Sequence, residues 1–267
     1  MELLIENTLL GEINKEEIAI KRTIEFQNRD SKNKNILAFS GGKDSMVTYD
    51  ILKRSGIEFE VIYSPPSVDA PELINFMKKY YPEVYWQPYL KDKKDKEITM
   101  WTLIPKKLMP PTRMVRYCCD VLKERTGDSG DTIYLGVRWA EGSKRSKQSM
   151  VGFWKKKIVV KPIIDWSDEE IWEYIRKYNL PYCKLYDQGW KRIGCIGCPL
   201  SSNQKMELDK YPAYRSNYIS AFERMLEERK RKGKVSKWET GEEVMSWWLG
   251  ENQKQKVIDG QCSIFGD

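Results

Sequence analysis

Apolar runs alternate with amphipathic stretches through the first part of the chain. Runs rich in apolar, β-branched and aromatic residues predict strands, and these cover residues 35–39, 59–64, 83–89, 132–137 and 157–162. Apolar positions that recur every three to four residues predict helices at residues 14–28, 46–54 and 71–80. Strands that alternate with helices build a parallel sheet with helices on both faces, so we expect an α/β fold that binds ligands at the carboxyl ends of its strands.

The pattern changes after Pro199, where the strand-like runs give way to polar helical sequence. Residues 201–232 predict one long helix, in which aromatic residues recur at spacings of three and four and predict a packing seam. Residues 244–249 predict a short helix that docks on the body. We therefore divide the chain into an N-terminal helical segment (1–32), an α/β domain (33–200) and a C-terminal helical appendage with a tail (201–267).

The most informative local sequence is Ser-Gly-Gly-Lys-Asp-Ser at residues 40–45, directly after the first predicted strand. A turn between a strand and a helix presents backbone N–H groups at the helix N-terminus, where the helix dipole favours an anion. Gly41 and Gly42 allow close approach because they have no Cβ atom. Lys43 adds positive charge, and the hydroxyls of Ser40 and Ser45 add donors. The loop is predicted to bind phosphate, although its spacing is not that of a Walker A loop.

Length and composition favour a globular protein with a buried core. The 267-residue chain is 40% hydrophobic and 32% charged. No apolar run approaches the roughly 20 residues that span a bilayer, and residues 1–7 hold two glutamates where a signal peptide has a basic start. We expect a cytoplasmic protein with no membrane partner. Histidine is absent, so a site for a soft metal has to be built from cysteine.

Two basic clusters are more informative than the net charge of +7. Lys144, Arg145 and Lys147 follow a predicted strand, and residues 229–237 hold six basic residues in nine positions. Either cluster is able to meet a nucleotide or a nucleic-acid backbone. For the second cluster an ordinary exposed helix end stays open as the alternative.

Four of the six cysteines form two tight pairs, Cys118 with Cys119 and Cys195 with Cys198 in a Cys-x-x-Cys turn. In a cytoplasmic chain, paired cysteines favour metal or redox chemistry over a structural disulfide. Adjacent cysteines occupy two corners of a zinc tetrahedron only with strain, whereas a cubane cluster with separated irons accepts them. An iron–sulfur cluster is the preferred interpretation, while zinc, a redox disulfide or unreactive thiols stay open. Cys183 is interpreted as a spare thiol.

Residues 40–45 resemble the PP-loop, S-G-G-x-D-S, of the ATP pyrophosphatases, which cleave ATP between the α and β phosphates. Together with the cysteine pairs downstream, they resemble the PAPS/APS reductase family, which comprises sulfonucleotide reductases and their ATP-using relatives. Further stretches are similar to motifs of that family: residues 135–143 (G-x-R-x-x-E-S), 161–172 (P-L-x-D-W-T-x-x-D-V-W) and 180–189 (L-P-Y and L-Y-x-x-G). The resemblance covers about residues 33–200.

This resemblance implies a fold, a cofactor and a set of site residues. The fold is the Rossmann-like one of the adenine nucleotide α-hydrolases, and a [4Fe-4S] cluster is held by Cys118, Cys119, Cys195 and Cys198. The nucleotide, which is ATP, PAPS or APS, is bound by residues 40–45 with Gly136, Arg138 and Arg145. Lys43, Asp44 and Arg138 are implied in catalysis. Asp44 orients a Mg²⁺ ion, and Arg138 with Arg145 neutralises charge on the leaving group.

A complete PP-loop separates this chain from the sulfonucleotide reductases, which carry degenerate versions of it. We therefore predict cleavage of ATP to AMP and pyrophosphate, which activates an acceptor for sulfur transfer, as in nucleic-acid thiolation or phosphorothioation. The alternative is a thiol-dependent reductase that releases sulfite from PAPS or APS. A non-catalytic, DNA-associated binding module is a third class.

The C-terminal tail is the second difference. The reductases end in Glu-Cys-Gly-x-His, whose cysteine attacks the sulfonyl sulfur, whereas this chain has Cys262 without the glutamate and the histidine. Residues 261–265 (Gln-Cys-Ser-Ile-Phe) resemble the peptide that docks replication and repair proteins on the sliding clamp. Cys262 as a nucleophile, clamp docking and a tail with no role all stay open. So do a homodimer and the identity of the sulfur acceptor or thiol reductant.

Overall fold

The structure is a computed structural model that describes residues 3–8 and 11–251. The chain divides into two compact units. The first contains Met1–Thr99 and Cys118–Cys195, and the second contains Met100–Tyr117 and Ile196–Asp267. The chain thus leaves the first unit at residue 100 and returns to it at residue 118. The sequence pattern does not predict that residues 100–117 belong to the second unit.

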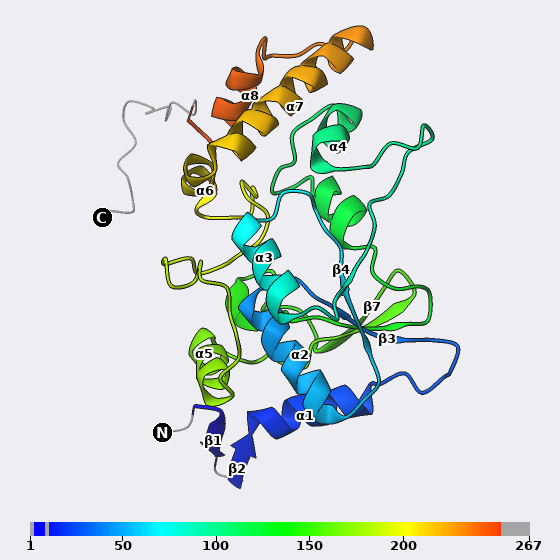
Figure 1. Ribbon diagram of the computed structural model, residues 1–267, viewed down its shortest axis with the longest axis vertical. Helices are drawn as coiled ribbons and strands as arrows, with labels where there is room; N and C mark the ends of the chain where they lie inside the picture. The colour runs from blue at the N-terminus through cyan, green and yellow to red at the C-terminus, as the bar shows by residue number, and fades with distance from the viewer. Residues whose placement is uncertain (1–2, 9–10, 252–267) are drawn as a thin grey trace, which may run out of the picture. The chain divides into compact units, whose positions relative to one another are not determined.

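A six-stranded sheet forms the centre of the first unit, in the order β5-β4-β3-β6-β8-β7 (Figure 1). Its strands are β3 (Asn35–Ala38), β4 (Glu60–Tyr63), β5 (Tyr85–Trp86), β6 (Thr132–Tyr134), β7 (Val151–Trp154) and β8 (Lys157–Val160). Neighbouring strands pair in parallel, except that β7 is antiparallel to β8. The prediction of an α/β fold built on a parallel sheet is confirmed.

Two strands differ from the sequence prediction. β5 spans two residues, whereas residues 83–89 were predicted. β7 was not predicted at all. It is joined to β8 by Lys155 and Lys156, which both have positive φ values, 48° and 62°. Tight hairpin turns of this kind usually carry glycine or asparagine, so two lysines gave no turn signal.

The helices of the first unit begin and end where local sequence dictates. They are α1 (Lys15–Glu25), α2 (Lys43–Ser55), α3 (Pro71–Tyr80) and α5 (Asp168–Lys177), and the hairpin of β1 (Ile5–Thr8) and β2 (Gly11–Asn14) precedes them. The side chain of Asn14 caps α1, and Gly56 ends α2 in the left-handed conformation. Ser167 and Glu170 form a capping box at the start of α5.

Both faces of the sheet are covered. On one face the hydroxyl of Tyr134 in β6 donates to the backbone carbonyl of Thr23 in α1. On the other face Ile36 and Ile133 pack together, and the backbone of Gly127 lies so close that a Cβ atom there would be 2.6 Å from Ile133 Cδ1. Gly127 follows η1 (Cys119–Lys123), a short π-helical turn. The segment with the cysteine pair is therefore held against the sheet.

The second unit is helical. It consists of α4 (Met100–Lys107), α6 (Gln204–Lys210), α7 (Pro212–Arg231) and α8 (Gly241–Trp248), and α4, α6 and α8 all pack on α7. The single helix predicted for residues 201–232 is broken at Tyr211, because Pro212 has no N–H to continue α6 and instead starts α7. Trp248 fixes α8 in place, since its ring contacts Tyr218 and its indole N–H donates to the carbonyl of Pro111 at 2.6 Å.

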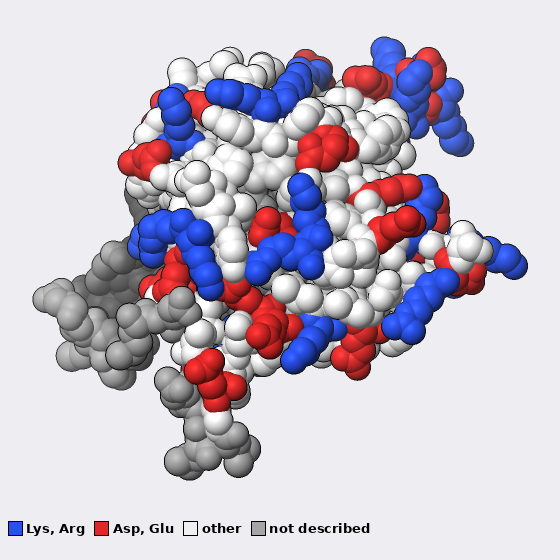
Figure 2. Space-filling view, turned by 60° about the horizontal axis from the view of Figure 1, so that its bottom comes forward, with Lys and Arg blue, Asp and Glu red and all other residues white. Residues whose placement is uncertain are grey.

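No helix among residues 3–8 and 11–251 is long and apolar enough to cross a bilayer. Figure 2 shows basic and acidic side chains interspersed over one face, without a large area of a single sign. The net charge of +7 is therefore not concentrated on that face. Cys262 and the clamp-like residues 261–265 lie outside the described residues.

Candidate functional site

The glycine-rich loop of residues 40–45 lies at the carboxyl end of β3 and leads into α2. Gly41 adopts a φ of 71°, and a Cβ atom there would lie 2.6 Å from the sulfur of Met77 in α3. Both the backbone conformation and the packing therefore require glycine. Gly42 is the N-cap of α2 and brings no side chain to the helix N-terminus. The loop reaches the first turn of α2 as bare backbone, as the sequence predicts for an anion site.

Hydrogen bonds within the loop hold this shape. Ser45 Oγ donates to the carbonyl of Gly42 at 2.8 Å and accepts from the N–H of Ser40 at 3.3 Å. The N–H of Lys43 donates to the hydroxyl of Tyr186 at 2.8 Å. Burial raises the pKa of Tyr186, so this hydroxyl stays protonated and neutral at physiological pH. The backbone N–H of Lys43 thus donates to a neutral hydroxyl, and an anion would be a stronger acceptor for it.

An ion-pair network crosses the loop, and Arg138 lies at its centre. Its side chain is 1% exposed. Nε donates to Asp44 Oδ1 at 2.6 Å, and Nη2 donates to Asp168 Oδ1 at 2.6 Å. Lys43 Nζ lies 3.1 Å from the same oxygen of Asp168 and 3.4 Å from Asp44 Oδ2. Two cations and two carboxylates therefore meet where α2 begins.

Electrostatics favour the charged forms of Arg138 and Asp168. Burial alone would lower the pKa of Arg138, but the carboxylates of Asp44 and Asp168 raise it above its usual value. Burial likewise would raise the pKa of Asp168, but hydrogen bonds from Lys43 and Arg138 bring it below the ordinary range. The predicted contact of Arg138 with the substrate's charge stays a prediction. The structure shows that its guanidinium donates to both Asp44 and Asp168.

Gly136 was predicted to contact the nucleotide, and the structure shows a close packing contact. A Cβ atom at this position would lie 2.6 Å from the carbonyl oxygen of Asp44 and 2.8 Å from the backbone nitrogen of Ser45. The segment after β6 thus lies directly against the backbone of the loop of residues 40–45. Any side chain here would push the two segments apart.

We expect Gly136→Ala to reduce the free energy of unfolding by about 1–3 kcal/mol, because the added methyl group meets backbone atoms that cannot rotate away. It should also weaken nucleotide binding, since Asp44 and Ser45 would shift. Denaturant unfolding and calorimetric titration with nucleotide measure the two effects. Gly152→Ala in β7 is the matched control, because its Cβ atom would meet nothing closer than 3.9 Å. Equal effects of the two substitutions would contradict the packing argument.

Arg145 is connected to the network through one intermediate residue. It forms an ion pair with Glu141, and Glu141 Oε2 accepts a hydrogen bond from the N–H of Arg138 at 2.9 Å. Glu141 ends η2 (Trp139–Glu141), the short turn that follows Arg138. The residues predicted to bind nucleotide are therefore linked from residue 40 to Arg145 by contacts within the first unit.

Lys123 brings the two cysteine-bearing segments of the first unit to one place. Burial would lower its pKa, but Asp69 and a hydrogen-bonded Cys195 raise it, with a further contribution from Cys119. Lys123 Nζ lies 3.7 Å from Asp69 Oδ1, and the other oxygen of Asp69 accepts from the hydroxyl of Tyr63 at 2.6 Å. Asp69 also forms a backbone bridge with Cys195. A cationic, buried environment of this kind stabilises thiolates.

The described residues include five of the six cysteines. Cys118, Cys119, Cys183, Cys195 and Cys198 form no disulfide among these residues. Within the described residues, no group of three or more cysteine, aspartate or glutamate side chains is arranged to hold a metal ion. Cys198 belongs to the second unit, three residues after Cys195, so the chain keeps their Cα atoms within about 11 Å of each other. Cys183 is buried, in keeping with its interpretation as a spare thiol.

Sequence reasoning missed three residues of this region as site residues: Lys123, Asp168 and Tyr186. Tyr186 and Asp168 lie inside stretches that carry the family resemblance, but neither was singled out as a site residue. Lys123 follows Cys119 by four residues, a spacing that places it one helical turn further along. That spacing is the one signal that could have drawn attention to it.

The family model described as the phosphoadenosine phosphosulfate reductase domain matches residues 34–201. The chain belongs to this family. Among curated relatives, an uncharacterized protein of Methanocaldococcus jannaschii is 29% identical over 207 residues, which are 72% of this chain and 49% of the relative. A second protein of that organism is matched over 36% of its length, so the chain spans half or less of these two relatives.

Other family members are nearer to this chain in length. The adenosine 5'-phosphosulfate reductase of Shouchella clausii is 28% identical over 190 residues, which are 66% of this chain and 75% of the relative. Among solved structures, the phosphoadenylyl-sulfate reductase of Candida auris in its phosphate complex aligns with a TM-score of 0.46 and 16% identity, covering 71% of this chain and 91% of that chain.

Proposed function

We propose that this protein cleaves ATP to AMP and pyrophosphate and thereby activates an acceptor for sulfur transfer. One observation carries the proposal: the loop of residues 40–45 is complete and enters α2 as bare backbone, with the Lys43 side chain directed to Asp168 in a buried network. Backbone N–H groups, a helix dipole and a fixed ammonium are the elements that hold and stabilise a polyphosphate.

The proposed reaction is an adenylyl transfer. A hydroxyl or carbonyl oxygen of the acceptor attacks the α-phosphorus of ATP, a bond forms between them, and the bond from that phosphorus to the bridging oxygen breaks. Pyrophosphate leaves with the electron pair, and the acceptor's proton is lost to solvent. Hydrosulfide or an equivalent sulfur donor then displaces AMP from the acceptor. Lys43 would neutralise the charge that develops on the leaving pyrophosphate.

Asp44 and Asp168 would supply oxygen ligands for Mg²⁺, which proteins bind through one or two carboxylates together with substrate phosphates. Asp168 fits this role because its side chain is 59% exposed. Asp44 is held in a single orientation by Arg138. The lowered pKa of Asp168 favours its ionised form, which a hard cation requires.

Cys118, Cys119, Cys195 and Cys198 are proposed to hold a [4Fe-4S] cluster, which would supply a redox or sulfur-handling centre. The donor set fits, since thiolates are the ligands of such clusters and two of the four cysteines share the environment of Lys123. An anaerobic preparation should be brown, with broad absorbance near about 400 nm. Cys195→Ser should abolish this absorbance, whereas Cys183→Ala should retain it. A colourless protein with stoichiometric zinc would overturn the cluster.

The reaction itself is tested by a side-by-side assay under anaerobic conditions. Labelled ATP is incubated with the protein and pyrophosphate is measured, while PAPS and APS are incubated with a thiol reductant and sulfite is measured. The proposal expects pyrophosphate from ATP and no sulfite. Absence of all products would favour the binding module that the sequence left open.

A sulfonucleotide reductase is the second candidate, because the Shouchella clausii relative bears that name. This candidate expects sulfite from APS or PAPS and no pyrophosphate from ATP. In that case Cys262 is the thiol proposed to attack the sulfonyl sulfur. Undiminished sulfite release by Cys262→Ser would exclude that role.

A further inference from the structure

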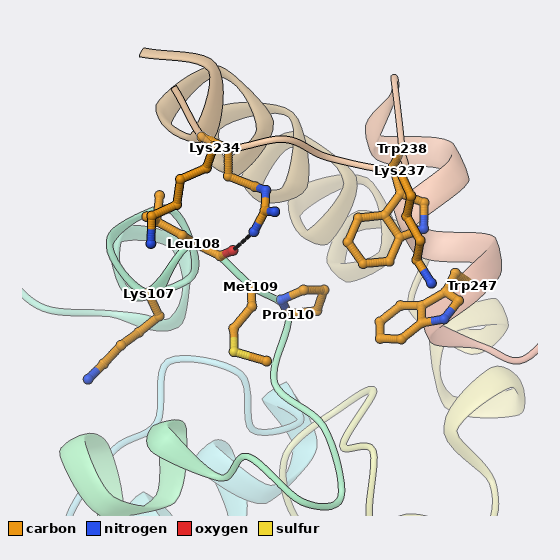
Figure 3. A pocket seen from close by; sticks show the side chains of 9 residues that line it. Lys107, Leu108, Met109, Pro110, Lys234, Lys237, Trp238 and Trp247 are labelled. Atoms are coloured by element: carbon orange, nitrogen blue, oxygen red, sulfur yellow. Dashed lines mark hydrogen bonds between the residues drawn. The ribbon is translucent and has the colours of Figure 1, made fainter. Parts of the chain in front are cut away.

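A cavity of about 420 Å³ opens in the second unit (Figure 3). Leu108, Met109 and Pro110, directly after α4, provide its apolar wall. Figure 3 shows Trp238 and Trp247 together on one side of the cavity, with Lys234 near Leu108 on the other. The volume is in the range of pockets that bind small molecules and cofactors.

Four cations line this cavity, and no acidic residue does: Lys107, Arg229, Lys234 and Lys237. Within the described part of the chain none of the four forms an ion pair with a carboxylate. Arg229 donates to the carbonyl oxygen of Leu108 at 2.8 Å and to that of Val235. Because these acceptors are neutral, the charge of Arg229 is not compensated. The cavity therefore attracts anions.

The aromatic side of the cavity is suited to flat rings. The ring centroids of Trp238 and Trp247 are 4.8 Å apart, and both side chains are partly exposed. Lys237 Nζ lies 4.8 Å from the centroid of Trp238 and 4.9 Å from that of Trp247. Indole faces and cations in one site are the combination that proteins use to stack bases and hold phosphates of an unpaired strand.

We propose that this cavity binds single-stranded nucleic acid, with bases against Trp238 and Trp247 and phosphates on Lys107, Arg229 and Lys234. A strand fits better than one nucleotide because cations continue beyond the cavity. Residues 229–237 hold six basic and no acidic residues, and residues 100–117 hold four basic and no acidic residues. A duplex fits less well, since its bases are already stacked and do not reach recessed indoles.

If the strand is also the acceptor for sulfur transfer, this inference names the class of acceptor, and that part rests on the function proposed above. Binding of the strand is independent of the proposed function, because the cavity is built entirely from residues of the second unit. Failure of one is therefore distinguishable from failure of the other. Lys43→Met should lose ATP cleavage and retain oligonucleotide binding.

The test measures binding of labelled single-stranded DNA and RNA oligonucleotides to the full chain by fluorescence polarisation, without ATP. Trp238→Ala and Trp247→Ala are each expected to raise Kd about 5- to 150-fold, the range found when a base loses its aromatic partner. Trp247→Phe should retain most of the affinity, which separates stacking from misfolding. Trp154→Ala, an exposed tryptophan of β7 in the first unit, is the matched control and should leave Kd unchanged.

The charge part is tested by salt dependence. Lys107→Ala and Lys234→Ala should each reduce the slope of log K against log salt concentration by about 0.7, the value for one phosphate contact of a single strand. Lys21→Ala, an exposed lysine of α1, should leave the slope unchanged. The inference is overturned by absence of oligonucleotide binding at low salt, by tryptophan variants that bind like the parent, or by equal affinity for duplex, heparin or an acidic peptide. A clear preference for DNA or for RNA would support it and identify the strand.

Discussion

Arg138→Met is expected to lower the free energy of unfolding by about 3–5 kcal/mol, because three hydrogen bonds of a buried guanidinium are lost and the partly buried carboxylate of Asp44 loses its cation. The guanidinium binds Asp44, Asp168 and the carbonyl of Trp166 through three different nitrogens. Methionine has a comparable length and no charge, so the loss reports on the network more than on packing. Urea denaturation at neutral pH measures the effect.

Arg145→Met is the matched control for this stability effect. Arg145 makes a partly exposed pair with Glu141 on the same turn, and pairs of this kind contribute at most about 1 kcal/mol. The difference between the parent and Arg138→Met should also shrink in acid. Since the pKa of Asp168 is lowered in the folded protein, its contribution is complete at neutral pH and is lost as the pH falls through that lowered value. Equal destabilisation by the two substitutions would contradict the central position of Arg138.

Lys43→Met is expected to reduce kcat for ATP cleavage about 10²- to 10³-fold, the usual cost of removing one group that stabilises developing charge. The reason is local, because Lys43 is the first residue of α2 and its side chain is 7% exposed beside Asp168. Pyrophosphate release under saturating ATP measures the effect. A melting curve of the variant shows whether the fold is retained.

Lys53→Met provides the comparison for this substitution. Lys53 is in the last turn of the same helix, and its ammonium lies 5.4 Å from the ring centroid of Tyr49, away from the loop of residues 40–45. Its substitution should leave kcat unchanged. Should Lys43→Met cleave ATP at the parent's rate, the assignment of the phosphate site to this loop would fail.

Much of the first unit could be predicted because its signals are local. The glycine pair of residues 41–42 predicted a tight turn before a helix, and the structure has a positive φ at Gly41 and a helix that starts at Lys43. Ser167 and Glu170 are a local signal of the same kind, because they form the capping box that starts α5. Such features depend on residues within about four positions of each other, so a short segment of sequence is enough to predict them.

Other features escaped prediction because their partners are far apart in the chain. Lys155 and Lys156 form a hairpin turn that lysine rarely occupies, and its stability comes from the pairing of β7 with β8. The helix break before Pro212 has a local cause, because the proline itself interrupts the helix. We predicted one helix over residues 201–232 because we gave more weight to its aromatic periodicity than to this proline.

The sequence by itself determined the α/β fold, the tight glycine turn before α2 and the family, because hydrophobic period, glycine turns and motif spacing are all properties of nearby residues. Only the tertiary structure decided that Arg138 is enclosed by Asp44 and Asp168, and that Trp238 lies against Trp247 beside uncompensated cations. These contacts join residues of different elements. Their geometry follows from how helices pack and strands pair, which no single stretch of the chain encodes.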